Sequence, residues 1–156
     1  MDQYQDQHHA MTPQELAEAC ARAMWEGDSA SQDLGMKLEH VAPGVAVLSM
    51  TVTRSMTNGH GNAHGGYLFT LADSAFAFAC NTYNQITVAQ NCAITFLAPG
   101  TLGDHLTATA RERSRSGRSG LYDVQVTRED GKVIAEFRGH SRTVKGTLLS
   151  PQGDGV

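Results

Sequence analysis

The chain offers no disulfide framework, no membrane-spanning run and no secretion signal. Its three cysteines, Cys20, Cys80 and Cys92, are an odd number without C-x-x-C spacing, which fits reduced thiols in a cytoplasm. No apolar run approaches the ~20 residues that a membrane helix needs. Residues 1–10 have neither the basic region nor the apolar core of a signal peptide. We therefore expect a cytoplasmic protein that makes no contact with membranes.

An excess of positive charge is also missing. The formal net charge is −4 and the isoelectric point is near 5.9, so nothing general suggests a nucleic-acid partner. The 156 residues, 40% of them hydrophobic, suit one globular domain with a real core. We expect that domain to cover residues 11–146, between flexible tails at residues 1–10 and 147–156.

The hydrophobic periodicity predicts an α+β fold. Thr12, Pro13 and Glu15 form the start signal of a helix that should run to about Glu26. A second helix, long and apolar, is expected at about residues 65–83. Alternating patterns predict strands at about 36–41, 45–52, 86–97, 104–115, 119–128 and 132–144. This order favours one curved antiparallel sheet with the long helix buried in its concave face.

The most informative stretch is the glycine-rich loop that runs from Asn58 into the long helix. Asp73 is the only acid in that helix, and an acid is costly to bury unless it is paired or used. It is either a catalytic carboxylate or a structural acid paired with an arginine or a backbone amide. Gly65 and Gly66 expose backbone N–H groups at a helix N-terminus, where negative charge is favoured. A simple tight turn is the alternative explanation of this glycine pair.

Spacing separates the two candidate groups. Gly65 and Asp73 are eight residues apart, so they lie ~12 Å apart along one helix axis. They cannot both reach one reacting carbon from the same chain. If both serve one site, two antiparallel helices of a homodimer must bring them together, twice per dimer.

The remaining candidates carry weaker signals. Asn58 either positions water or a carbonyl, or serves only a turn, and His64 is equally plausible as an N-cap residue. The stretch from Ser114 to Gly120 suits a phosphate-bearing ligand or a solvated hairpin tip. His60 and His64 have helical spacing but lie in a loop without a following glutamate, so we expect no metal site.

The run from Asn58 to Cys80 resembles the hotdog-fold acyl-CoA thioesterases, more narrowly the PaaI-type phenylacetyl-CoA thioesterases. Its motifs there are Asn58-Gly-His, His64-Gly-Gly and Leu68-Phe-Thr-Leu-Ala-Asp73. Further matches are Phe96-Leu-Ala-Pro-Gly100, Gly103-Asp104, Tyr122-Asp123 and Phe137-Arg-Gly139. The resemblance implies a long helix wrapped by a curved antiparallel sheet, and dimers that usually assemble as tetramers.

The resemblance also implies roles for individual residues. Asp73 is the nucleophile or the general base, and the Gly65 N–H holds the oxyanion. Asn58 orients the water or intermediate, and His64 supports the loop and contacts the thioester. Gly117, Arg118 and Ser119 match the turn that commonly holds the phosphates of coenzyme A.

The acyl site is less defined by the resemblance. Phe69 and Phe76 either line an aromatic acyl pocket or belong to the core. Some relatives place a hydroxyl in the strand that enters the site, whereas Val88-Ala-Gln-Asn91 has none. Either Gln90 or Asn91 is the candidate contact in its place, and Asn91 is taken as the acyl-site residue. The implied ligand is acyl-CoA itself, with no separate cofactor and no metal.

The expected activity is hydrolysis of phenylacetyl-CoA or hydroxyphenylacetyl-CoA to free acid and coenzyme A in phenylacetate degradation. A hotdog enoyl-CoA hydratase or dehydratase is the rival enzyme. A non-catalytic acyl-CoA-binding module is the third alternative. It would need an attached DNA-binding segment, and the N-terminal ~30 residues contain no helix-turn-helix pattern.

Overall fold

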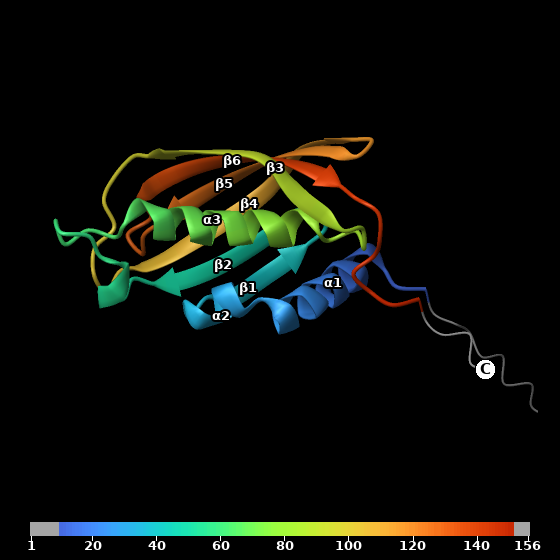
Figure 1. Cartoon of the computed structure of the whole chain (residues 1–156), viewed down its shortest axis with the longest axis horizontal. Helices are drawn as coiled ribbons and strands as arrows, with labels where there is room; N and C mark the ends of the chain where they lie inside the picture. The colour runs from blue at the N-terminus through green and yellow to red at the C-terminus, as the bar shows by residue number, and fades with distance from the viewer. Residues whose placement is uncertain (1–9, 152–156) are drawn as a thin grey trace, which may run out of the picture.

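A six-stranded antiparallel sheet curves around one long helix in this chain, as Figure 1 shows. The computed structural model describes residues 10–151. The helices are α1 (Pro13–Gly27), α2 (Ser29–Asp33), the 3-10 turn η1 (Arg54–Met56) and α3 (Gly65–Cys80). The strands are β1 (Lys37–Ala42), β2 (Val45–Thr51), β3 (Thr87–Phe96), β4 (His105–Ser116), β5 (Ser119–Thr127) and β6 (Val133–Thr143), in the order β1-β2-β4-β5-β6-β3. The predicted α+β hotdog architecture is confirmed.

Helix α3 lies in the concave face because its buried side is built from small and aromatic residues. Ala72, Ala75 and Ala79 are fully buried, so the sheet approaches the helix closely. Phe76 fills the remaining space against Tyr122 and Phe137, at ring-centroid distances of 5.6 and 5.8 Å. A β-carbon on Gly139 would come within 2.7 Å of the Phe76 ring, so only glycine fits there. The core thus fixes α3 rigidly beneath β4, β5 and β6.

The boundaries of the helices follow their capping residues. Helix α1 begins with the predicted capping box, in which the Glu15 N–H donates to Thr12 Oγ1 and the Thr12 N–H donates to Glu15 Oε1. Helix α3 ends three residues before the predicted position. The Asn81 side chain donates to the Thr87 carbonyl and accepts from the Thr87 N–H, which turns the chain into β3.

Two short elements were not predicted. Asp28, which follows α1, caps α2, because its Oδ1 accepts from the Ser31 N–H at 3.0 Å. The Ser31 hydroxyl in turn lies 2.9 Å from that of Ser74, which ties α2 to α3. The turn η1 precedes the glycine-rich loop.

The expected tails lie mostly outside the described residues, except for Ala10 and residues 147–151. Within the described part, the N–H groups of Leu148 and Leu149 both donate to Asn84 Oδ1, at 3.0 and 2.9 Å. No helix between residues 10 and 151 has the length and apolar character to cross a membrane.

Candidate active site

The loop before α3 is held by its own polar side chains. Asn58 Oδ1 accepts from the N–H groups of His60 and Asn62, at 2.9 and 3.2 Å. His64 is the N-cap of α3, and its Nδ1 accepts from the Gly66 N–H at 3.0 Å. The turn and N-cap roles that the sequence left open are therefore present for both residues. The Asn58 Nδ2 amide makes no hydrogen bond within residues 10–151, so it can donate to a ligand.

The Gly65 N–H is the one donor of the first helical turn that the protein leaves open. His64 satisfies the next three N–H groups: Gly66 bonds to its ring, and Tyr67 and Leu68 bond to its carbonyl. No acceptor for the Gly65 N–H exists among residues 10–151. An open N–H at a helix N-terminus attracts negative charge, because the helix dipole adds to its own partial charge.

Asp73 lies half-buried two turns further along α3. Burial raises the pKa of its carboxyl above the usual value for aspartate. Within residues 10–151 its carboxylate has no hydrogen bond and no ion pair, so the alternative of a structural acid paired with an arginine or an amide finds no partner. A desolvated carboxylate that nothing compensates is a functional candidate.

Two thiols surround that carboxylate. Burial and then the nearby Asp73 charge raise the pKa of Cys92 on β3. Cys80 follows Asp73 by seven residues on α3, and burial raises its pKa to about 12, with Asp73 adding to the shift. Both thiols stay protonated at neutral pH and are poor nucleophiles. These two thiols are therefore poor candidates for the catalytic nucleophile.

The open stripe of α3 contains the candidate carboxylate. Gly66, Thr70, Asp73 and Ala77 repeat at spacings of three and four and share one helix face, and none of them is fully buried by the protein's own sheet. Asn58, His64 and Gly65 gather at the N-terminal end of this stripe. Asp73 lies ~12 Å away along the axis, as the spacing predicted. One chain therefore does not bring the oxyanion donor and the carboxylate together.

The three acyl-site candidates lie in different surroundings. Phe76 is 1% exposed and belongs to the core, the alternative that the sequence left open. Phe69 is half-buried and packs edge-on against Phe137 at 5.3 Å. Asn91 is exposed on β3, opposite His140 of β6. Of these side chains, only Phe69 and Asn91 remain accessible to a ligand in the single chain.

The turn between β4 and β5 is a two-residue loop at the far end of the sheet (Figure 1). Gly117 adopts a φ of +58° there, which a hairpin turn of this length requires and glycine adopts without strain. Arg118 and Ser119 are exposed. No ion pair of the Arg118 side chain exists within residues 10–151.

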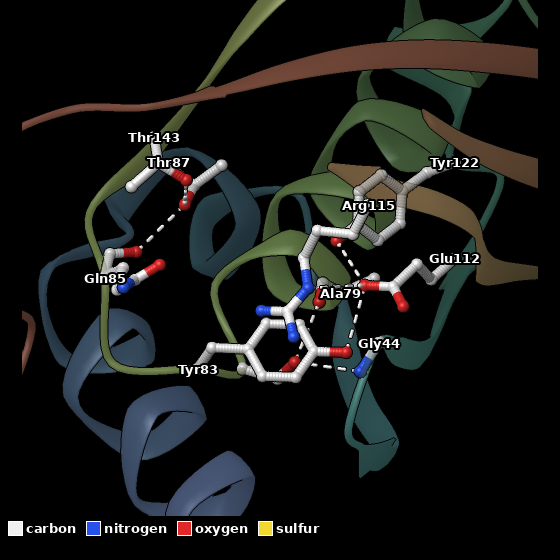
Figure 2. Close-up of polar contacts among 10 residues, drawn as sticks. Gly44, Ala79, Tyr83, Gln85, Thr87, Glu112, Arg115, Tyr122 and Thr143 are labelled. Carbon is white, nitrogen blue, oxygen red and sulfur yellow. Dashed lines mark hydrogen bonds and ion pairs between the residues drawn. The ribbon is translucent and has the colours of Figure 1, made fainter. Parts of the chain in front are cut away.

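Arg115 is held in a different way, as Figure 2 shows. Its guanidinium stacks 3.5 Å from the ring centroid of Tyr83, and its Nε lies 3.7 Å from Glu112 Oε1. The hydroxyls of Tyr83 and Tyr122 both donate to that same oxygen, each at 2.9 Å. These four side chains anchor the β4–β5 hairpin to the end of α3. Of the two arginines in the turn sequence, Arg118 is thus the one left for a ligand.

Sequence reasoning missed this anchor. A signal was nevertheless present, because Glu112 continues the inward-facing positions of Ala108 and Ala110 on β4. A charged residue at an inward position predicts a buried polar partner. No group of three or more metal-ligating side chains occurs between residues 10 and 151.

A curved sheet around one helix, with an open N-terminal amide and an unpaired carboxylate on the free helix face, defines a hotdog-fold protein equipped for ester or thioester chemistry. Comparison with known proteins makes this assignment specific. Residues 60–135 match the profile of the Thioesterase superfamily. The chain belongs to this superfamily and, within it, to the PaaI-type acyl-CoA thioesterases.

Two relatives support the assignment, one of them both by its sequence and by its solved structure. The acyl-coenzyme A thioesterase PaaI of Escherichia coli is 46% identical over 128 residues, which cover 82% of this chain and 91% of that protein. The structure of E. coli PaaI, from the phenylacetic acid degradation operon, superposes with a TM-score of 0.86 over 87% of this chain and 99% of that one, at 44% identity. A hypothetical thioesterase of Streptococcus pneumoniae, solved with coenzyme A, gives a TM-score of 0.69 at 27% identity, covering 72% of this chain and 90% of that one.

Proposed function

We propose that this chain hydrolyses the thioester of phenylacetyl-CoA or hydroxyphenylacetyl-CoA, releasing coenzyme A and the free acid in phenylacetate degradation, in the cytoplasm. The observation that carries the chemistry is the pair of unsatisfied groups on the free face of α3, the Gly65 N–H and the Asp73 carboxylate. The substrate is proposed from the E. coli relative, which comes from the phenylacetic acid degradation operon. Three unpaired cysteines are consistent with a reducing compartment.

Gly65 supplies the electrostatic part of the proposed mechanism. Attack on the thioester carbon moves an electron pair onto the carbonyl oxygen. An N–H at a helix N-terminus stabilises that oxyanion more strongly than the uncharged carbonyl, so it lowers the barrier instead of merely tightening binding. The free Nδ2 amide of Asn58, fixed by the bonds of its own Oδ1, is placed to orient the water or intermediate.

Asp73 supplies the nucleophile or the base. In the first route its carboxylate attacks the carbonyl carbon, the thiolate of coenzyme A leaves, and water then cleaves the mixed anhydride. In the second route it takes a proton from water as the water attacks, and the same thiolate leaves. Both routes require the ionised carboxylate, and desolvation makes that carboxylate more reactive.

The site is complete only in a homodimer, which we propose assembles further into a tetramer. β3 is a ten-residue strand at the free edge of the sheet, with Val88 and Phe96 46% and 51% exposed. A long apolar edge of this kind favours pairing with another copy. Antiparallel packing of the free α3 faces would place Gly65 of one protomer beside the partner's carboxylate at position 73.

The β4–β5 turn is the proposed site for the phosphates of coenzyme A. Arg118 is exposed and unpaired within the described residues, and β6 places Arg142 opposite Ser119. Guanidinium groups bind phosphate oxygens in pairs of hydrogen bonds, and hydroxyls add donors. The solved S. pneumoniae relative with coenzyme A supports a coenzyme A ligand for this fold.

Replacing Arg118 should separate binding from chemistry. Arg118→Ala is expected to raise KM for acyl-CoA about tenfold, which corresponds to the loss of one charge-assisted contact, and to leave kcat nearly unchanged. The matched control is Arg113→Ala, because Arg113 is also exposed but pairs with Asp123 at 3.5 Å. Steady-state kinetics with acyl-CoA and with the truncated acyl-pantetheine, which lacks the nucleotide, make the measurement. An equal loss on both substrates would place the effect of Arg118 away from the phosphates.

Release of free thiol from a panel of acyl-CoA esters tests the proposed function. Phenylacetyl-CoA and hydroxyphenylacetyl-CoA should give the highest kcat/KM beside acetyl-, benzoyl- and palmitoyl-CoA. Loss of enoyl absorbance from crotonyl-CoA without thiol release would instead establish the hydratase. Tight binding of acyl-CoA without turnover would establish the binding module.

A further inference from the structure

Phe96 is an aromatic residue that is not buried in the core. It is the last residue of β3 and is 51% exposed. Its ring nevertheless reaches the first residue of α3, because a β-carbon on Gly65 would lie 2.8 Å from Phe96 Cζ. The ring therefore lies against the one helix residue whose N–H is open, with part of its surface free.

The inward face of β3 runs beside the open stripe of α3 in the same chain. Cys92, Ile94 and Phe96 alternate with outward-facing residues and so share one face of the strand. Cys92 lies within electrostatic reach of Asp73, and Phe96 contacts Gly65. The strand thus passes Asp73 and then Gly65 of its own chain, which contribute to two different sites of the proposed dimer, and the aromatic side chain lies beside Gly65.

The other phenylalanine rings near α3 are buried in the core or, for Phe69, half-buried against Phe137. Phe76, Phe78 and Phe137 are at most 2% exposed, and Phe69 packs on Phe137. None of these rings contacts Gly65 in the way that Phe96 does. An aromatic wall for the reacting end of a substrate is thus available from Phe96 and not from the fully buried residues.

We propose that Phe96 is a specificity-determining residue that packs against the acyl group of the substrate, an inference that rests on the proposed thioesterase function. A carbonyl oxygen bound to the Gly65 N–H lies about 2.7–3.1 Å from that nitrogen. The carbonyl carbon is one bond further, and its acyl substituent one bond beyond that. An acyl group held in this way must pass the ring that touches Gly65.

Chemistry favours the acyl group over the pantetheine arm as the occupant. The ring offers an apolar aromatic surface, which suits an aryl or alkyl acyl group better than the amide-rich arm of coenzyme A. Within one protomer, the proposed phosphate turn also lies at the opposite end of β3 and β6 (Figure 1), because Phe96 pairs with Ala135 whereas the turn residue Ser119 pairs with Arg142.

Substitution of Phe96 tests the inference on intact protein. Phe96→Ala and Phe96→Leu should lower kcat/KM for phenylacetyl-CoA about tenfold and leave acetyl-CoA within about twofold, which is the range expected when an aromatic contact is lost. Phe96→Tyr keeps the ring and should keep the preference. The matched control is Leu102→Ala, because Leu102 is another large hydrophobic residue, 58% exposed, that is not among the candidate site residues.

Two outcomes would overturn the inference. One such outcome is an equal change in kcat/KM for phenylacetyl-CoA and acetyl-CoA, which leaves the ratio of the two values unchanged. The other is dissociation of the assembly in size-exclusion chromatography with light scattering. Either result would make Phe96 only a contact between copies of the chain. Binding of hydrolysis-resistant thioether analogues of the two substrates, followed by calorimetry, separates this failure from that of the proposed function. If wild-type protein releases no thiol but Phe96→Ala still selectively weakens the aryl analogue, the hydrolase proposal fails and the role of Phe96 stands.

Discussion

Replacing Asp73 with asparagine should abolish thioester hydrolysis and make the fold more stable. Asparagine is isosteric but cannot act as a base or as a carboxylate nucleophile, so we expect kcat to fall at least about 10³-fold with little change in KM. Stability should rise because the ionised Asp73 is partly desolvated and no described residue compensates its charge. Thiol-release kinetics and thermal unfolding of the same preparation measure both effects.

The pH dependence of this variant follows from the direction of the pKa shift. The folded-state pKa of Asp73 is raised, so the folded protein binds this proton more tightly than the unfolded chain does. The stability gain of Asp73→Asn is therefore fully present above the raised pKa, and it shrinks as the pH falls through that pKa and the wild-type acid becomes neutral. Wild-type kcat/KM should fall over the same acidic range, because only the carboxylate is active.

Ser74→Ala is the matched control for Asp73→Asn. Ser74 is the next residue on α3, and its hydroxyl lies 2.9 Å from that of Ser31. This variant should keep full activity and lose some stability, the reverse of the Asp73 pattern. Retention of substantial activity by Asp73→Asn would remove Asp73 from the chemistry, and a marked loss of stability would mean that the carboxylate is a structural anchor.

The sequence was sufficient for the order of the two long helices and the six strands, though not for α2 and η1, and for the groups at the start of α3. Alternation and capping signals are local, so the strands and the Thr12 capping box were predicted within a few residues. The separation of Gly65 and Asp73 was also predictable, because helix geometry alone sets it. Secondary structure, capping and spacing along a helix depend on residues that are close in the chain, so they can be predicted from the sequence.

Properties that depend on contacts between residues far apart in the chain could not be predicted. The sequence could not decide whether Phe76 faces a pocket or the core, because the answer depends on Gly139, 63 positions later in the chain. The residues of the turn alone also could not separate Arg115 from Arg118, although the resemblance pointed to Arg118, because the distinction comes from Tyr83 and Glu112. The exposed ring of Phe96 became a candidate for substrate contact only because the fold places it against Gly65.

Gly65→Ala is expected to lower kcat about 10²–10³-fold, the usual effect of losing one oxyanion donor. The added methyl group would lie 2.8 Å from the Phe96 ring, so the ring or the helix start must shift, and the N–H then points away from the reacting oxygen. Gly66→Ala is the comparison variant, because there the added atom meets the His64 ring, at 3.1 Å, and not Phe96. Its loss should be smaller, and circular dichroism should show the same fold for both proteins.

Mixing the two inactive variants would then test whether the site is shared between protomers. A mixed dimer of Gly65→Ala and Asp73→Asn chains contains one site with both native groups and one site with neither. Random exchange makes half the dimers mixed, so activity should return to about one quarter of the wild-type value. If each site were built within one chain, every site would carry one defect and mixing would restore nothing.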